Sequence, residues 1–127
     1  QVIIDVGHNP HAAKYLSEKL TALNKHSIEG KIIAVCGMLK DKDANGVFAH
    51  LTPIIDEWHC VTLGGYRGQS GDELEEKLKS HFPYVQATSD NSVIDGVRTA
   101  LKSAVKNDVV LVFGSFHTVA EFWSVVE

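Results

Sequence analysis

The segment QVIIDVGHNPHAA (residues 1–13) decides the fold, because it joins a strand pattern directly to a helix pattern. Its apolar, β-branched run is ended by Gly7, which predicts a buried strand. Asn9 is a good N-cap and Pro10 suits a first helical turn, so a helix is expected from here to Leu23. The segment therefore predicts a strand-to-helix junction that is crowded with polar side chains.

The same alternation of short apolar runs and longer helical patterns continues to the end of the chain. Further strands are predicted over residues 31–39, 57–63, 84–88 and 108–114. Helices are predicted over residues 44–55, 72–82, 92–106 and 115–126. Pro53 is expected to end the first of these helices near Leu51. Repeated strand–helix units predict one doubly wound α/β domain over residues 1–127, with a mainly parallel sheet of five to six strands and helices on both faces.

Capping residues mark where the later helices are expected to begin. A capping box places Ser or Thr at the N-cap and Glu or Gln three residues later. The predicted caps are Ser70 with Glu73, Ser89 or Asp90, and Thr118 with Glu121.

The composition is that of an ordinary globular domain, with 44% apolar residues, 22% charged residues and a formal net charge of -4. The negative charge argues against a broad nucleic-acid surface, which is usually basic, and leaves room for one phosphate-bearing ligand. Cys36 and Cys60 lie in apolar runs, so they are expected to be buried, reduced thiols of a cytoplasmic protein.

Two features of the sequence bear on where the protein works. No apolar run approaches the roughly 20 residues that a membrane-spanning helix requires, and no signal-peptide pattern is found, so no membrane partner is expected. The chain has no initiator Met and opens on a strand pattern. It is therefore expected to be a domain excised from a longer chain.

Ligands of doubly wound sheets bind beyond the carboxyl ends of the strands. Polar or glycine-rich segments follow four of the predicted strands, at residues 5–9, 40–43, 64–68 and 115–117. An aspartate at such a position either caps a turn or accepts hydrogen bonds from the hydroxyl groups of a ribose. Both interpretations apply to Asp5. The sequence thus predicts a polar ligand site at this edge of the sheet.

Residue spacing disfavours several familiar chemistries. His8 and His11 lack the further ligands that zinc requires, so no metal site is expected in this chain. Ser115 lies in GSFHT, which lacks the second glycine of a hydrolase nucleophile elbow. Ser115 is instead expected to cap a helix, or to help the free backbone N–H groups at the helix start hold a carboxylate. Lys42 belongs to a solvated charged turn or donates to an anion. Because the chain contains neither G-x-G-x-x-G nor a P-loop, most of any ATP triphosphate must be bound by something other than these residues.

Three segments at predicted strand ends resemble the signatures of one family. DVGHNPHAA (residues 5–13) resembles the D-x-x-H-N-P-x-A motif of folylpolyglutamate and dihydrofolate synthases. GMLKDKD (residues 37–43) and GSFHTVAE (residues 114–121) resemble the later motifs of that family. The likeness covers nearly the whole chain and is greatest to the C-terminal domain of the bacterial bifunctional dihydrofolate synthase/folylpolyglutamate synthases.

These enzymes belong with the Mur ligases, in which an N-terminal P-loop ATPase domain precedes a smaller Rossmann-like domain. The resemblance implies that residues 1–127 are the C-terminal domain alone, and that the P-loop domain is a partner in the same chain. It implies a ligase reaction in which ATP phosphorylates a carboxylate of dihydropteroate or of a folate's glutamate tail, and the amine of L-glutamate then attacks the acyl phosphate. Mg²⁺ is expected to be bound by the absent domain. The longer chain is expected to be monomeric, and the isolated domain inactive.

The resemblance also implies roles on the nucleotide side of the site. Asp5 matches the motif aspartate and is expected to contact the ATP ribose. His8 matches the motif histidine, which implies a catalytic position near the phosphates or the incoming glutamate. Asn9 sets the helix start and is expected to reach the nucleotide. Gly7 stands where many relatives have alanine, a departure that affects none of these roles.

On the glutamate side, Lys42 aligns with a family lysine, which implies a catalytic role and an ion pair with a glutamate carboxylate. Ser115, with the helix start behind it, resembles the place where Mur-type ligases hold the amino-acid carboxylate. His117 is a further candidate for the same ligand. Arg67, in the glycine-rich loop, has no assigned role.

Three rival interpretations remain open from the sequence. The chain is alternatively a non-catalytic module that binds a nucleotide or an acidic metabolite, or the C-terminal domain of another Mur-type amino-acid ligase. A receiver-like signalling domain with Asp5 as phosphoacceptor would need an acidic pair and a lysine after the last strand, where this chain has GSFH.

Overall fold

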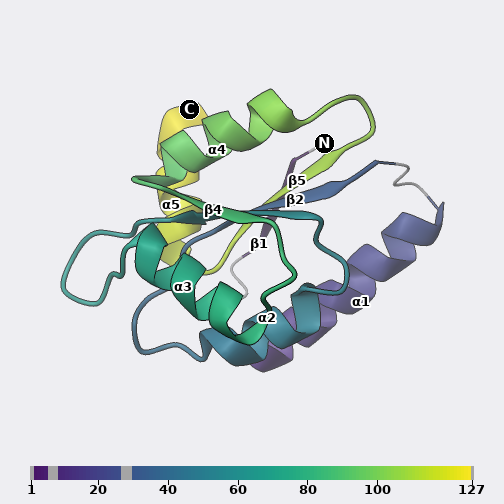
Figure 1. The fold of residues 1–127 in the computed structure, drawn as a ribbon. Helices are drawn as coiled ribbons and strands as arrows, with labels where there is room; N and C mark the ends of the chain where they lie inside the picture. Colours follow the sequence, from purple (N-terminus) through teal and green to yellow (C-terminus); the bar gives the residue numbers. More distant parts are fainter. Residues whose placement is uncertain (1, 6–8, 27–29, 127) are drawn as a thin grey trace.

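The computed structural model describes residues 2–5, 9–26 and 30–126, within which five strands alternate with five helices (Figure 1). The strands are β1 (Val2–Asp5), β2 (Ile32–Cys36), β3 (Glu57–Val61), β4 (Ala87–Asp90) and β5 (Val109–Phe113). The helices are α1 (Pro10–His26), α2 (Ala44–Leu51), α3 (Gly71–His81), α4 (Val93–Ser103) and α5 (Phe116–Val126). The alternation predicted from the sequence is confirmed, including the end of α2 at Leu51.

All strand pairs of the sheet are parallel, in the order β1-β5-β2-β3-β4. Figure 1 shows α1, α2 and α3 on one face of the sheet and α4 and α5 on the other. This division follows from the right-handedness of parallel crossover connections. Connections that proceed from β1 toward β4 place their helices on one face, and the connection that returns from β4 to β5 places its helix on the other. Helix α4 makes the return, from β4 to β5, and contacts β2 and β3 on the way. The predicted doubly wound α/β fold is confirmed.

Each face of the sheet has its own apolar core. On the face of α1, α2 and α3, the Trp58 ring packs edge-on against Phe48, with ring centroids 5.3 Å apart, and against Phe113 at 6.1 Å. On the opposite face the core is mainly β-branched and includes Val35 and Val112 of the central strands. Strands β2 and β5 are buried along their whole length, which explains why they read as continuous apolar runs.

The predicted caps of α1 and α3 are confirmed. The Asn9 side chain accepts a hydrogen bond from Ala12 N at 2.8 Å, and Ser70 Oγ accepts one from Glu73 N at 3.1 Å. The fourth predicted strand, over residues 84–88, begins later than expected, at Ala87. A turn in which Val85 N donates to the Phe82 carbonyl occupies the preceding residues.

The predicted cap of α4 is wrong, and of the two residues predicted to cap α5 the structure confirms Ser115 and not Thr118. Asp90 is still in strand β4, and Ser92 caps α4 by accepting from Asp95 N at 3.1 Å. Ser115, rather than Thr118, caps α5. Glu121 is not part of a capping box, because its carboxylate accepts a hydrogen bond from Val93 N at 3.1 Å and thereby joins α5 to the start of α4.

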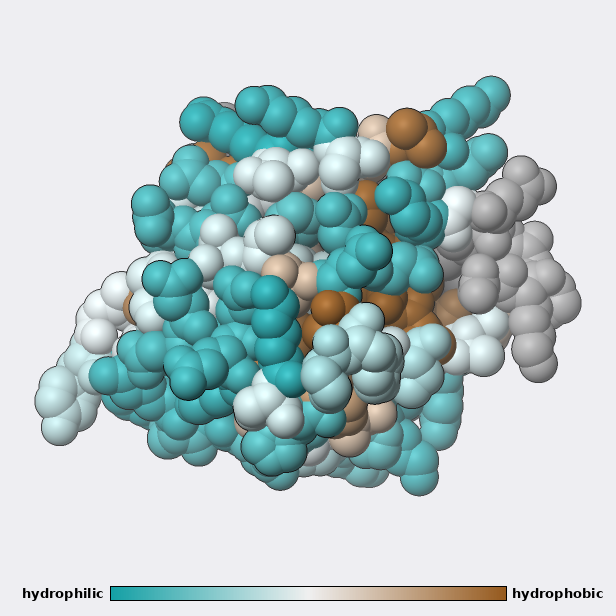
Figure 2. Space-filling view, viewed as in Figure 1, coloured by the Kyte–Doolittle hydropathy of each residue, from teal (hydrophilic) through white to brown (hydrophobic). Residues whose placement is uncertain are grey.

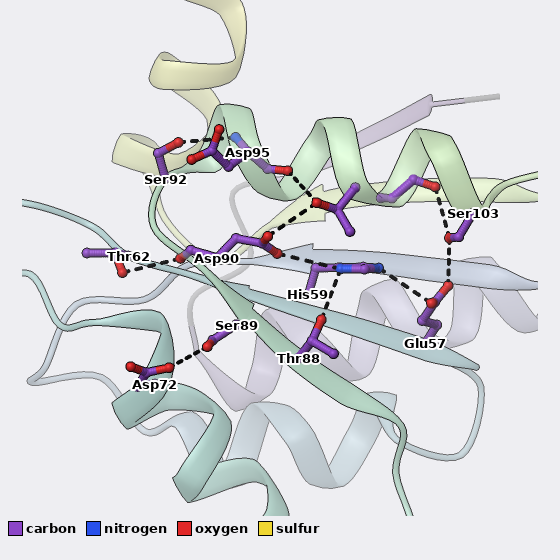
Figure 3. Close-up of polar contacts among 12 residues, drawn as sticks. Glu57, His59, Thr62, Asp72, Thr88, Ser89, Asp90, Ser92, Asp95 and Ser103 are labelled. Atoms are coloured by element: carbon purple, nitrogen blue, oxygen red, sulfur yellow. Dashed lines mark hydrogen bonds and ion pairs between the residues drawn. The ribbon is translucent and has the colours of Figure 1, made fainter.

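A buried polar cluster ties β3, β4 and α4 together (Figure 3). His59 is 2% exposed, and its ring nitrogens lie 3.6 Å from Asp90 Oδ2 and 3.7 Å from Glu57 Oε1. The Asp90 carbonyl accepts from Thr62 N at 3.1 Å, and Thr62 Oγ1 accepts from Gly71 N at 2.9 Å. On the α4 side, Ser103 Oγ donates to Glu57 Oε2 at 2.9 Å. The cluster therefore joins α4 to β3, and through Thr62 it fixes the end of β3 against the start of α3.

The two cysteines occupy paired positions on neighbouring strands. Cys36 and Cys60 are free, buried and opposite each other in the β2–β3 register, as expected for reduced thiols in a core. Burial raises the pKa of the Cys36 thiol well above its ordinary value and raises that of Cys60 to about 12. Among the described residues, no helix is both long and apolar enough to cross a bilayer.

Candidate ligand-binding site

The carboxyl edge of the sheet around β5 is where the topology predicts a ligand site. Strand β5 lies between β1 and β2 and leads into α5 on one face, while β1 and β2 lead into α1 and α2 on the other. The chain therefore diverges to opposite faces on both sides of β5, which is the geometry of a ligand site in a doubly wound sheet. The three segments that resemble family motifs follow β1, β2 and β5, so they meet here.

The ends of β2 and β5 approach each other too closely for a side chain. Gly114 has φ +123°, and a Cβ there would overlap the carbonyl oxygen of Gly37. Gly37 N donates to the Phe113 carbonyl at 3.2 Å, and the Gly37 carbonyl accepts from Thr118 Oγ1 at 2.9 Å. Glycine is therefore required at 114 by both the backbone conformation and the contact.

Ser115 lies in the middle of this edge, and its side chain caps the start of α5. It is 3% exposed, and its Oγ accepts from Thr118 N at 3.1 Å. The same Oγ lies 3.1 Å from Thr118 Oγ1. Because the single hydroxyl proton of Thr118 goes to the Gly37 carbonyl, Ser115 must be the donor in this second bond. Both hydrogen-bonding roles of the Ser115 hydroxyl are thus fulfilled within the protein.

The β1 side of the edge carries the predicted nucleotide residues. Asp5 is half-buried, ends β1, and pairs in register with Phe113 of β5. Asn9 precedes α1, and its side-chain oxygen caps that helix. His8 lies outside the described residues, and so does the side chain of His117, whose backbone belongs to the first turn of α5.

In the charged segment after β2, two aspartates make contacts within the protein and Lys42 has no ion pair among the described residues. Asp43 caps α2 by accepting from Gly46 N at 3.0 Å, and Asp41 forms an ion pair with Arg67. The hydrogen bond from Arg67 lowers the pKa of the Asp41 carboxyl below its ordinary value. Lys42 is half-buried, and no ion pair of its amine is found among the described residues.

The segments after β2 and β3 are joined, which the sequence did not indicate. Gln69 is 2% exposed; its amide donates to the Met38 carbonyl at 3.2 Å and accepts from Lys77 Nζ at 3.0 Å. Lys40 N donates to the Arg67 carbonyl at 2.8 Å. The contacts of Gln69 with Met38 and of Lys40 with Arg67 link residues about 30 apart in the chain, so no local pattern predicts them.

The described residues do not form a metal site. Within residues 2–5, 9–26 and 30–126, no three His, Cys, Asp or Glu side chains come together as metal ligands. His11 is exposed on α1, as its helical position predicts.

Comparisons with known proteins agree with this architecture. The chain is 90% identical over 126 residues to the dihydrofolate synthase/folylpolyglutamate synthase of Haemophilus influenzae strain Rd, a match that covers 99% of this chain and 29% of that protein. It superposes with a TM-score of 0.88 and 43% identity on E. coli FolC in complex with DHPP and ADP, covering 98% of this chain and 28% of that one. A crystal structure of a bifunctional folylpolyglutamate synthase/dihydrofolate synthase with Mn, AMPPNP and L-glutamate bound matches with a TM-score of 0.83 and 42% identity, again over 98% of this chain and 28% of that one.

The chain thus spans less than a third of the length of the relatives that it matches. The family model described as "Mur ligase, glutamate ligase domain" matches residues 1–116, which is most of the chain. With the parallel sheet and the three motif segments gathered at its carboxyl edge, this match shows that the chain belongs to the Mur ligase glutamate ligase domain family.

Proposed function

We propose that residues 1–127 are the C-terminal domain of an ATP-dependent folate ligase that joins L-glutamate to dihydropteroate, to folate glutamates, or to both. The observation that carries the proposal is the meeting of segments 5–13, 37–43 and 114–121 at adjacent strands of one sheet edge. An N-terminal P-loop domain of the same chain completes the enzyme. The whole protein is monomeric and cytoplasmic and acts on small molecules, without nucleic acid or membrane partners.

The reaction joins a carboxylate to an amine, with ATP as the source of activation. ATP is bound between the two domains and supplies the phosphoryl group that activates the acceptor carboxylate. In this chain, Asp5 accepts hydrogen bonds from the ribose hydroxyls, as acidic residues do beside strands of nucleotide-binding folds. Asn9 fixes the start of α1 beside it. His8 faces the phosphates or the incoming glutamate, where a charged or donating imidazole stabilises negative charge.

The incoming glutamate lies on the other side of β5. The first N–H groups of α5 hold its carboxylate, because helix N-termini attract anions and leave their first N–H groups without helical partners. Ser115 keeps that helix start in place, and His117 lies in the same turn. Lys42 forms an ion pair with a carboxylate of the same ligand. Held at both ends, the glutamate presents its amine to the activated carbon.

A divalent cation would neutralise charge on the phosphates when bound. The described residues of this chain contain no cluster of three possible ligands for it, so we place its ligands in the P-loop domain. We also place the binding of most of the triphosphate in that domain, because the sequence contains no P-loop motif. We therefore expect the isolated 127-residue chain to release no ADP in the presence of L-glutamate.

The proposal is tested on the full-length parent chain. ADP release is followed with ATP, Mg²⁺ and L-glutamate, using dihydropteroate or tetrahydrofolate as the acceptor. We expect release with at least one acceptor, and we expect Asp5→Asn to raise the KM for ATP about tenfold or more, since a hydrogen bond to a charged group is worth about 1.5–3 kcal/mol. Asp95→Asn, at the exposed first turn of α4, is the control and should behave as the parent chain does.

Three results would separate the rivals. Release with one acceptor alone narrows the enzyme to that step. No release with either, from a folded protein that turns over with a cell-wall precursor and an amino acid, identifies another Mur-type ligase. No turnover with any of these substrates, combined with measurable ATP binding, leaves the non-catalytic binding module.

A further inference from the structure

The segment between β3 and α3 (residues 62–70) has a buried base beneath an exposed tip. Figures 1 and 2 show this segment projecting from the body of the molecule beyond the carboxyl edge of the sheet. Tyr66, at the tip, is 99% exposed, whereas Gln69, at the base, is 2% exposed. A buried primary amide is costly unless its N–H and carbonyl groups are hydrogen-bonded, so the partners of Gln69 show what it holds.

The Gln69 amide is hydrogen-bonded at both of its ends. Its Nε2 donates to the Met38 carbonyl at 3.2 Å and to the Leu39 carbonyl at 3.5 Å, both in the segment after β2. Its Oε1 accepts from Lys77 Nζ of α3 at 3.0 Å. Because an ammonium group can only donate, Lys77 fixes which end of the amide faces β2. Gln69 therefore ties the segment after β2 to the start of α3.

The Leu39 carbonyl carries this contact on to Lys42. The same carbonyl that accepts from Gln69 also accepts from Lys42 N at 3.3 Å, so residues 39–42 form a turn that the neighbouring segment holds from outside. The Lys42 carbonyl accepts from Ala44 N at 3.0 Å, at the start of α2. The Lys42 backbone is thus fixed on both sides, while its half-buried side chain has no ion pair among the described residues.

Backbone contacts hold the same two segments together independently of the Gln69 side chain. Leu39 and Gly68 form an antiparallel bridge, and Lys40 N donates to the Arg67 carbonyl at 2.8 Å. Because these contacts use backbone groups, they remain available when Gln69 is replaced. A Gln69 variant is therefore expected to lose the contacts of the amide and to keep the two segments side by side.

We propose that Gln69 is a positioning residue for the ligase reaction, which sets the place of the Lys42 ammonium group through the turn at residues 39–42. The inference rests on the proposed function, in which Lys42 forms an ion pair with a carboxylate of the incoming glutamate. Hydrogen bonds and ion pairs weaken as distance and angle depart from their optimum, so a small shift of this turn weakens the pair. The predicted nucleotide residues follow β1, on the other side of β5, and are not part of this chain of contacts.

The test measures steady-state ADP release by the full-length parent chain. We expect Gln69→Leu to raise the KM for L-glutamate about fivefold and to change the KM for ATP less than about twofold. Gln69→Glu is the second variant, because it keeps the size of the side chain and an oxygen for Lys77 but lacks the N–H donors, and an increase at least as large is expected. Ser103→Ala is the matched control: it removes a part-buried hydrogen bond at the last turn of α4 and should change neither KM.

A double-mutant cycle with Lys42→Met separates positioning from a general loss of structure. When position 42 is already methionine, Gln69→Leu should raise the KM for L-glutamate less than about 1.5-fold, because the group that it positions is gone. A merely structural role would lower kcat through the loss of folded enzyme and would leave the KM for glutamate unchanged. Urea unfolding of each variant shows how much folded enzyme the assay contains.

The outcomes are distinct. A KM increase that is confined to glutamate and disappears in the Lys42→Met background supports the proposal. An increase of equal size in both backgrounds overturns it, as does an unchanged KM for glutamate, or the failure of both Gln69 variants to fold, which would assign the amide to stability alone. These results leave the proposed function intact. A KM for glutamate that Lys42→Met does not raise overturns the proposed role of Lys42, and this inference with it.

Discussion

Replacing Ser115 by alanine separates two roles that its position allows. Ser70, Ser92 and Ser115 each accept a hydrogen bond from the backbone N–H three residues later, at 3.1 Å in every case. Loss of an N-cap hydroxyl typically costs about 1 kcal/mol of stability. Ser115 differs from the other two in being 3% exposed, so its removal also leaves the Thr118 N–H buried without its partner. We expect about 2 kcal/mol for Ser115→Ala and about 1 kcal/mol for Ser70→Ala and Ser92→Ala.

Stability and glutamate binding are measured on the same variants. Urea unfolding gives the loss of stability, and steady-state ADP release in the full-length chain gives the KM for L-glutamate. Because the hydroxyl of Ser115 already donates to Thr118, we expect it to act on glutamate only by positioning α5, with a KM increase below about threefold. Losing a direct hydrogen bond to a carboxylate would cost about 1.5–3 kcal/mol, or more than tenfold.

Either of two results would contradict these expectations for Ser115→Ala. A KM for glutamate that rises more than about tenfold would mean that Ser115 leaves Thr118 and donates to the ligand. A stability loss no larger than that of Ser70→Ala would mean that the buried N–H of Thr118 finds another partner, such as water. Thr118→Val is a further check, since it removes the acceptor of the Ser115 proton and the donor to Gly37 at once.

Two further predictions concern the stability of the fold. Gly114→Ala should cost about 2 kcal/mol or more in urea unfolding, because φ is +123° and a Cβ would overlap backbone, while Gly64→Ala, with nothing within 4 Å, should change stability by less than about 0.5 kcal/mol. Cys36 and Cys60 should resist a thiol reagent at pH 8 in the native protein and react fully in urea. Their folded-state pKa values are raised by burial, so their contribution to stability is complete at neutral pH and is lost as the pH rises from about 9 toward 12; equal labelling rates with and without urea would contradict both statements.

The elements were predictable from the sequence because their signals are local. The apolar runs of β2 and β5 and the Asn9–Pro10 start of α1 are read from neighbouring residues, and the structure has them where the pattern predicts. The predicted polar edge follows from the same signals, since parallel strands end on one side.

What the sequence did not predict depends on contacts between distant residues. The insertion of β5 between β1 and β2 is set by which strands pair, and each strand pattern is compatible with several orders. The cap of α4 was missed because β4 extends to Asp90, two residues later than the predicted strand, and this moves the cap to Ser92. The spacing of Thr118 and Glu121 predicts a capping box within α5. Spacing alone cannot show that the Glu121 carboxylate instead accepts a hydrogen bond from Val93 N of α4.

These contacts change how much the motifs say about activity. In GSFHTVAE, the structure gives Gly114, Ser115, Thr118 and Glu121 packing or hydrogen-bonding reasons to be what they are. A likeness to that motif is therefore evidence about the β5–α5 junction at least as much as about catalysis. Lys42 has no such structural partner among the described residues, although the neighbouring Asp43 has one. It follows that variants of Lys42 report on ligand binding more directly than variants of the last motif, where a loss of activity first has to be separated from a loss of stability.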